Sequence, residues 1–130
     1  MPAEVFVVDA SAMAVLLFDE PSGRAVARIL EGGHLSAPAI LPCELASVTL
    51  KKIALRPEQE PGLRAAAQLF ERMGVDLVAV PIEAIVRIAR RTGLSAYDAA
   101  YVWLAAELEA VLVTLDRSLK KGARRMGVRT

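Results

Sequence analysis

Two short apolar runs, residues 5–8 and 111–115, constrain the fold most, because each is rich in valine or leucine and stands directly before an aspartate. Apolar runs of this length are typical of strands buried on both faces, as in a parallel sheet. The carboxyl ends of parallel strands form the crevice in which open α/β sheets bind their ligands. We therefore expect Asp9 and Asp116, which follow the two runs, to meet at that crevice.

The segments around these runs predict helices that alternate with strands. Ser11 is expected to cap the first helix, and further strands are expected at residues 34–37 and 76–80. Helices are expected at residues 11–18, 22–31, 41–55, 58–73, 96–108 and 117–125, and from Ile82 to just before Gly93. This alternation predicts an α/β fold whose mostly parallel sheet is flanked by helices on both faces. Without a linker or repeat, residues 1–130 are expected to form a single domain.

The composition favours a globular protein and argues against a membrane protein or one held together by disulfides or zinc. At 55% apolar content, 130 residues are enough to bury one core. No charge-free stretch approaches the roughly 18 apolar residues of a membrane span, and residues 5–8 are too short for a signal-peptide core. With Cys43 as the single cysteine, no internal disulfide or structural zinc site is expected. We therefore expect a cytoplasmic protein that does not enter membranes.

The formal charge of +1 hides an asymmetry. Residues 117–129 hold six basic residues and no acid, so the preceding part carries the other 10 of the 16 basic residues against all 15 acids. This distribution, with a basic C-terminal segment after an acidic remainder, is what we expect if a polyanion approaches the protein from its C-terminal side. A solvated helix with a basic face explains the charges equally well.

Two further acids stand at helix starts. Glu44 lies in an otherwise apolar or small segment, so it is expected to be buried and to need a partner. Asp98 follows Ser95 at capping-box spacing, and capping alone would explain that pair. A carboxylate in the first turn also lies near any crevice toward which the helix points, so the two roles are compatible. Asp9 and Asp116 have the same alternative as helix caps.

Four segments that contain these acids resemble known sequence motifs. The segments are VVDAS at residues 7–11, PAILPCELASV at 38–48, GLSAYDAAY at 93–101 and VTLD at 113–116. They look like the four acidic motifs of the PIN-domain nucleases, and their order, spacing and total length most resemble the VapC toxins of prokaryotic toxin–antitoxin operons. The resemblance covers essentially the whole chain, and the third motif is the most specific.

The resemblance implies an endoribonuclease dependent on Mg²⁺ or Mn²⁺, with a flavodoxin-like parallel sheet. Carried onto this sequence, it assigns the catalytic and metal-binding carboxylates to Asp9, Glu44, Asp98 and Asp116. Ser11 and Thr114 match the small hydroxyl residues of the family's first and last motifs. The chain departs from the pattern near Val128, where the usual final strand would begin and stops almost at once.

The chemistry of the residues agrees with this assignment. Carboxylate oxygens suit Mg²⁺ or Mn²⁺, and such cations can activate water and stabilise the charge that develops on a phosphodiester. We expect Asp9 and Asp98 to be primary ligands, with Glu44 and Asp116 completing the site directly or through water, and one of them orienting or deprotonating the attacking water. Ser11 and Thr114 would donate hydrogen bonds to these carboxylates. The residues expected to hold RNA phosphates are Arg117, Lys120 and Lys121.

The resemblance also implies partners: a VapB-type antitoxin and a second copy of the chain in a homodimer. The alternative function is a catalytically silent PIN-fold protein that acts through antitoxin association and operon autoregulation.

A haloacid-dehalogenase-type phosphatase is disfavoured because Ser11 stands where its second aspartate would be. The remaining polar and aromatic residues are expected at the surface (His34) or in the core (Cys43, Tyr97, Tyr101 and Trp103), although one tyrosine could border the crevice.

Overall fold

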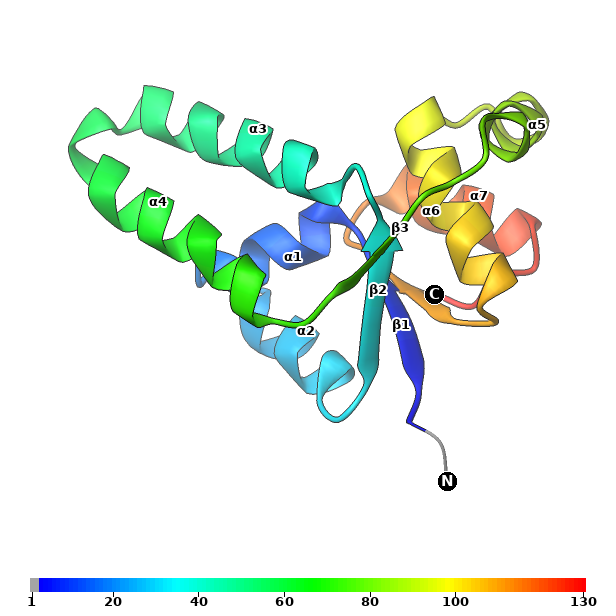
Figure 1. Cartoon of the computed structure of the whole chain (residues 1–130), viewed down its shortest axis with the longest axis horizontal. Helices are drawn as coiled ribbons and strands as arrows, with labels where there is room; N and C mark the ends of the chain where they lie inside the picture. Colours follow the sequence, from blue (N-terminus) through cyan, green and yellow to red (C-terminus); the bar gives the residue numbers. More distant parts are fainter. Residues whose placement is uncertain (1–2) are drawn as a thin grey trace.

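A computed structural model of the chain describes residues 3–130 and contains a four-stranded parallel sheet (Figure 1). Along the sheet the strand order is β3-β2-β1-β4. The strands are β1 (Val5–Val8), β2 (His34–Pro38), β3 (Asp76–Val78) and β4 (Val111–Val113). In the ladder, Val7 lies opposite Ser36 of β2 on one side and Leu112 of β4 on the other. The predicted α/β class and parallel pairing are confirmed.

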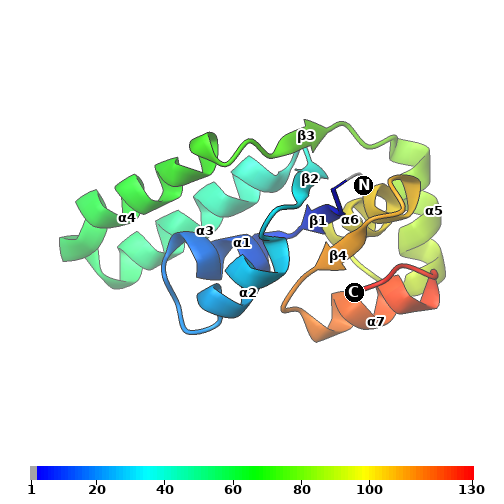
Figure 2. The same ribbon diagram turned by 90° about the horizontal axis from the view of Figure 1, so that it is seen from below.

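Seven α-helices surround the sheet in the described residues. They are α1 (Ala10–Leu17), α2 (Gly23–Leu30), α3 (Leu41–Leu55), α4 (Glu60–Gln68), α5 (Ile82–Thr92), α6 (Ala96–Glu107) and α7 (Arg117–Arg125). Figures 1 and 2 show the sheet between two groups of helices, α1 to α4 to one side and α5 to α7 to the other. The predicted cover on both faces is confirmed. Helices α3 and α4 form a hairpin whose far end projects beyond the sheet.

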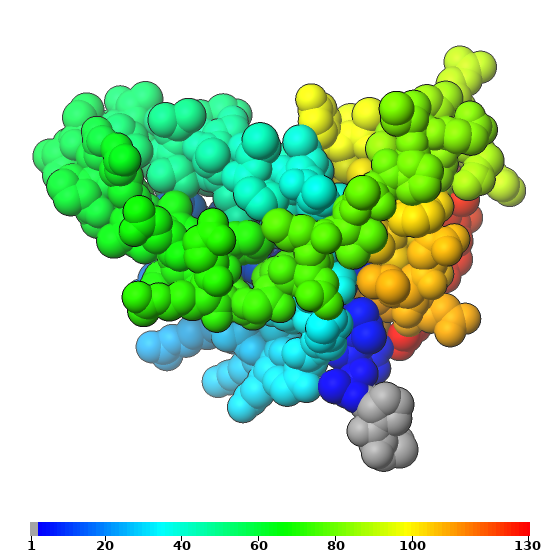
Figure 3. All heavy atoms as spheres, viewed as in Figure 1, coloured from blue at the N-terminus to red at the C-terminus, as the bar shows by residue number. Residues whose placement is uncertain are grey.

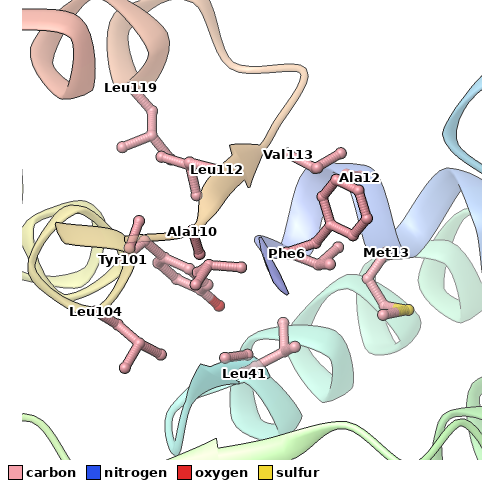
Figure 4. Close-up of a cluster of buried hydrophobic side chains, with 14 of the residues drawn as sticks. Phe6, Ala12, Met13, Leu41, Tyr101, Leu104, Ala110, Leu112, Val113 and Leu119 are labelled. Carbon is pink, nitrogen blue, oxygen red and sulfur yellow. The ribbon is translucent and has the colours of Figure 1, made fainter. Parts of the chain in front are cut away.

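The core explains why the first and last strands carry almost no polar residues. Val7 and Leu112 are fully buried. In Figure 4, Leu112 points toward Leu119 of α7, whereas the next residue, Val113, points toward Ala12 of α1. Successive residues of a strand face opposite sides of the sheet, so a strand covered on both sides must be apolar throughout.

Several elements are shorter than predicted, and three of them differ most. The segment expected as one helix at residues 58–73 is α-helical only in α4, with 3₁₀ turns at Pro57–Gln59 and Leu69–Arg72. The strand expected at residues 76–80 ends at Val78, because its partner β2 ends at Pro38 and leaves residues 79–80 without a ladder. Strand β4 ends at Val113, where its neighbour β1 gives way to α1.

The end of the chain adds one contact to the sheet. No strand forms around Val128, but the backbone N–H of Leu112 donates to the carbonyl of Arg129 at 2.8 Å. The Arg129 side chain binds the Glu4 carboxylate and the Glu109 carbonyl. No helix within residues 3–130 is both long and apolar enough to cross a membrane.

Candidate active site

Asp9 is held by three hydrogen bonds at the end of β1. Its Oδ1 accepts from Ser11 Oγ at 2.7 Å and from the Ala12 backbone N–H at 3.0 Å, and its Oδ2 accepts from Thr114 Oγ1 at 2.5 Å. The prediction that Ser11 caps α1 is wrong, because Asp9 itself is the cap and Ser11 donates to it. The side chain is only 6% exposed. Its orientation is therefore fixed before any ligand arrives.

Two hydroxyl groups join Asp9 to the backbone of two residues just after β4, Leu115 and Asp116. Thr114 Oγ1 accepts from the Asp116 N–H at 3.0 Å, and Ser11 Oγ accepts from the Leu115 N–H at 2.9 Å. Asp116 Oδ1 accepts from the Leu119 N–H at 3.1 Å, so Asp116 also caps α7. The two apolar runs thus bring the first and last acids to one edge of the sheet, as the sequence predicts.

Glu44 has the partner that its apolar surroundings require. It lies in the first turn of α3, which starts shortly after β2, and is half-buried. Its Oε1 accepts a hydrogen bond of 2.7 Å from the hydroxyl of Tyr101, a side chain that is 1% exposed. Sequence reasoning named Tyr101 only as a packing residue. Its position three residues after Asp98 places both on one face of α6, which is a signal that could have identified it.

Asp98 stands at the start of α6, and its backbone N–H donates to Ser95 Oγ at 3.1 Å. The helix-cap role of Ser95 is thus present. The Asp98 carboxyl also interacts with the other acids. Burial raises its pKa, and the charges of Asp116 and Asp9 raise it further. Asp98 therefore lies within electrostatic reach of the acids at the end of the sheet.

The pKa values of Asp9 and Glu44 are raised as well. Burial raises the pKa of Asp9 despite its hydrogen bonds, with a further contribution from Asp116. Burial also raises the pKa of Glu44, followed by the charges of Asp98 and Asp9, while the Tyr101 hydroxyl opposes the rise. The ion pairs within residues 3–130 use other acids, so the cluster has no cation of its own. It is a concentration of negative charge that a cation would stabilise.

Comparisons with known proteins agree with this arrangement. Residues 6–125 match the PIN domain. The chain belongs to the PIN domain family. It is 36% identical over 118 residues to VapC ribonuclease Mb0985 from Mycobacterium bovis and to ribonuclease VapC9 from Mycobacterium tuberculosis, with 88% of each chain covered. The crystal structure of PAE2754 from Pyrobaculum aerophilum superposes with a TM-score of 0.74 at 27% identity, over 92% of this chain and 84% of that one. This PIN domain is of the VapC type, as the four motifs predict.

The donor set of the PIN domain fits a hard divalent cation with a largely hydrated shell. The cluster offers only carboxylate oxygens, which are the ligands that Mg²⁺ and Mn²⁺ prefer. Within residues 3–130, no three Asp, Glu, His or Cys side chains are already grouped closely enough to hold a metal ion together. Mg²⁺ commonly keeps several waters and takes one or two protein carboxylates, so its binding does not require three acids grouped in advance.

Two predictions of burial near the site are wrong. Cys43 is exposed rather than a core thiol, because it lines the open cavity that also borders Glu44 and Tyr97. Tyr97 is 59% exposed and lines a cavity with Glu44, so it is the tyrosine that borders the crevice. Tyr101, by contrast, packs in the core as predicted. His34 is exposed, as predicted, and pairs with Asp76 at 2.6 Å.

The raised pKa values of Asp9, Glu44 and Asp98 predict how stability depends on pH without metal. The folded state holds these protons more tightly than the unfolded chain, whose carboxyls titrate near pH about 4. Their contribution to stability is therefore complete below that pH and is lost as the pH rises through the folded pKa values. We expect urea unfolding in EDTA to show Asp98→Asn gaining stability relative to wild type between pH 4 and 8. A constant difference across this range would contradict a raised pKa at Asp98.

Proposed function

We propose that this PIN domain is an endoribonuclease dependent on Mg²⁺ or Mn²⁺, the toxin of a toxin–antitoxin pair. The observation that carries the proposal is the convergence of Asp9, Asp116, Glu44 and Asp98 in one cluster without a protein cation. The names of the relatives, VapC ribonuclease and ribonuclease VapC9, support RNA as the substrate.

A divalent cation bound by the cluster would lower the pKa of a water and stabilise the charge that develops on the phosphodiester. The residues of the chain have separate parts in this reaction. Asp9, fixed by its three donors, and Asp98, at the start of α6, would be the main ligands. Asp116, joined to Asp9 through Thr114, would complete the site directly or through water.

Glu44 is the residue best suited to take a proton. Tyr101 donates to its Oε1, and no other hydrogen bond to the Glu44 carboxylate forms within residues 3–130, so Oε2 would accept the proton of the attacking water. Its raised pKa makes it a stronger base than an ordinary carboxylate. The oxygen of that water would then bond to phosphorus as the bond from phosphorus to the leaving ribose oxygen breaks, and the leaving oxygen takes up a proton.

The basic face of α7 is the proposed site for neighbouring RNA phosphates. Helix α7 begins directly after Asp116, and its side chains Arg117, Lys120, Lys121, Arg124 and Arg125 line a shallow hollow of about 440 Å³. We expect the Ala triple variant at positions 117, 120 and 121 to bind RNA more weakly, with the salt slope reduced by about one unit per lost contact. Anisotropy titrations at several salt concentrations would measure the slope. An unaltered slope would show that these residues are solvated surface only.

The proposed partners follow from the same family. A VapB-type antitoxin would bind this chain and block cleavage, and two copies of the chain would form a homodimer. Elution as a monomer at micromolar concentration, both alone and with the product of the neighbouring antitoxin gene, would reject this part of the proposal.

The choice of nucleic acid tests the proposed activity. Purified chain, free of any partner, would be incubated with an RNA and a DNA oligonucleotide of the same sequence, each with Mg²⁺. We expect internal cleavage of the RNA alone. Equal cleavage of the RNA and the DNA oligonucleotide would contradict specificity for RNA. Cleavage of neither would contradict the proposed ribonuclease activity.

The second candidate function is a PIN-fold binding protein without catalysis. It is favoured by the absence, within residues 3–130, of three acids already grouped closely enough to hold an ion. For such a protein, added Mn²⁺ would leave the thermal midpoint unchanged. A bound cation would raise the midpoint through preferential binding to the folded state.

A further inference from the structure

Glu44 also lines a cavity of about 410 Å³ whose other lining residues lie outside the group of four acids. The cavity is lined along α3 by Glu44, Ser47, Val48 and Lys51, which are at the spacing of successive helical turns. Ala10 of α1 and Tyr97 of α6 also line it. Figure 3 shows the notch between the start of α3, in cyan, and the start of α6, in yellow. The cavity is therefore continuous with the proposed catalytic site and differs from it in chemistry.

Tyr97 is the unusual side chain of this cavity. It precedes Asp98 in the chain, yet it is 59% exposed. A second hollow of about 250 Å³, lined mainly by apolar side chains, lies against it as well. The two hollows share Tyr97 and Ile40, so the aromatic ring stands between two open spaces next to a catalytic acid. An exposed tyrosine in this position offers a flat apolar surface on which a planar group can stack.

Lys51 supplies the one cation of the cavity lining. It follows Glu44 by seven residues, which is about 10 Å along the helix axis. Within residues 3–130 it forms no ion pair, whereas its neighbour Lys52 is bound to Glu20 at 2.5 Å. At that distance from Glu44, Lys51 would hold an anion next to the reacting phosphate and not the reacting phosphate itself.

We propose that this cavity is a nucleotide subsite for single-stranded RNA, in which Tyr97 stacks on a base and Lys51 binds the phosphate adjacent to the one being cleaved. The inference rests on the proposed ribonuclease function and extends it to the flanking nucleotide. Base stacking on an aromatic ring combined with a cation for the backbone is the usual means of binding single strands. The negative Glu44 at one end and the positive Lys51 at the other fit a phosphate only at the Lys51 end.

Steady-state cleavage of a short single-stranded RNA by the full chain with Mg²⁺ tests the subsite. We expect Tyr97→Ala to raise KM by about 5- to 150-fold, the loss typical of one stacked base, with a much smaller change in kcat. Tyr97→Phe keeps the ring and should restore KM to within about twofold of wild type. Lys51→Ala should raise KM and reduce its salt slope by about one unit. Arg28→Ala, which removes an exposed cation from α2, is the matched control and should change neither.

The results of this experiment test the nucleotide subsite and the ribonuclease activity separately. If wild type cleaves RNA and both Tyr97→Ala and Lys51→Ala keep its KM, the subsite is wrong and the ribonuclease stands. If Tyr97→Ala keeps the KM for RNA but loses affinity for the antitoxin, the cavity binds protein and the inference is overturned. If wild type cleaves no RNA, both the proposed ribonuclease function and the nucleotide subsite are wrong.

Discussion

Asp98→Asn is expected to abolish RNA cleavage and to leave the metal-free protein at least as stable as wild type. The cap of α6 survives, because Ser95 accepts from the backbone N–H of residue 98 and not from its side chain. The change removes one charge from the cluster that a divalent cation needs, and cations of this kind supply several kcal/mol of transition-state stabilisation. We expect a loss of about 100-fold or more in kcat.

The thermal stability of Asp98→Asn distinguishes a metal-binding role of Asp98 from a helix-capping role. Because Asp116 and Asp9 repel its charge, removing that charge should not destabilise the apo protein. Mn²⁺ should raise the thermal midpoint of wild type and raise that of the variant much less. Glu83→Gln, which removes an exposed first-turn carboxylate from α5, is the matched control and should behave as wild type. An Asp98→Asn protein that cleaves at the wild-type rate would return Asp98 to a capping role alone.

The second large effect is expected from Thr114→Val, which keeps the shape of the side chain and removes its hydroxyl. That hydroxyl donates to Asp9 Oδ2 and accepts from the Asp116 N–H, so it holds two of the four acids in relation to each other. Removing a residue that orients a metal-binding carboxylate typically costs 10- to 100-fold in metal affinity or activity. We expect a loss in this range in kcat/KM, together with weaker Mn²⁺ binding by calorimetry.

Thr49 provides a matched control for this change. It is also buried, but its hydroxyl donates to the Leu45 carbonyl within α3, away from the acids. Thr49→Val should therefore keep activity within about twofold, with a cost in stability of about 1 kcal/mol. Equal losses of activity in the two variants would mean that Thr114 acts through general stability.

The position of the site could be predicted from local signals. The apolar runs before Asp9 and Asp116 define buried parallel strands, and the carboxyl ends of such strands meet by geometry. The starts of α3 and α7 are also predictable, because Pro42 is tolerated in the first turn of α3 and Asp116 caps α7. Glu44 is predicted to need a partner, and the spacing of Tyr101 from Asp98 on α6 is a signal for one, but only the packing of α6 shows that the Tyr101 hydroxyl meets Glu44.

Burial was harder to predict than secondary structure. An apolar composition shows that a helix can be buried, and only the packing shows which face meets a neighbour. Cys43, at the start of α3, lines an open cavity, and Leu55, at the far end of α3 that projects beyond the sheet, is 83% exposed. The exposure of Tyr97 likewise depends on the opening between α3 and α6. Sequence alone therefore located the acids and missed the cavity beside them.

The most direct test of the acidic site is the initial rate at which partner-free protein cleaves a single-stranded RNA as Mg²⁺ is titrated. We expect no cleavage in EDTA, a saturable rise with Mg²⁺ or Mn²⁺, and recovery when excess metal is added back after EDTA. Cleavage that proceeds equally in EDTA and in Mg²⁺ would contradict a metal-dependent site built from Asp9, Glu44, Asp98 and Asp116.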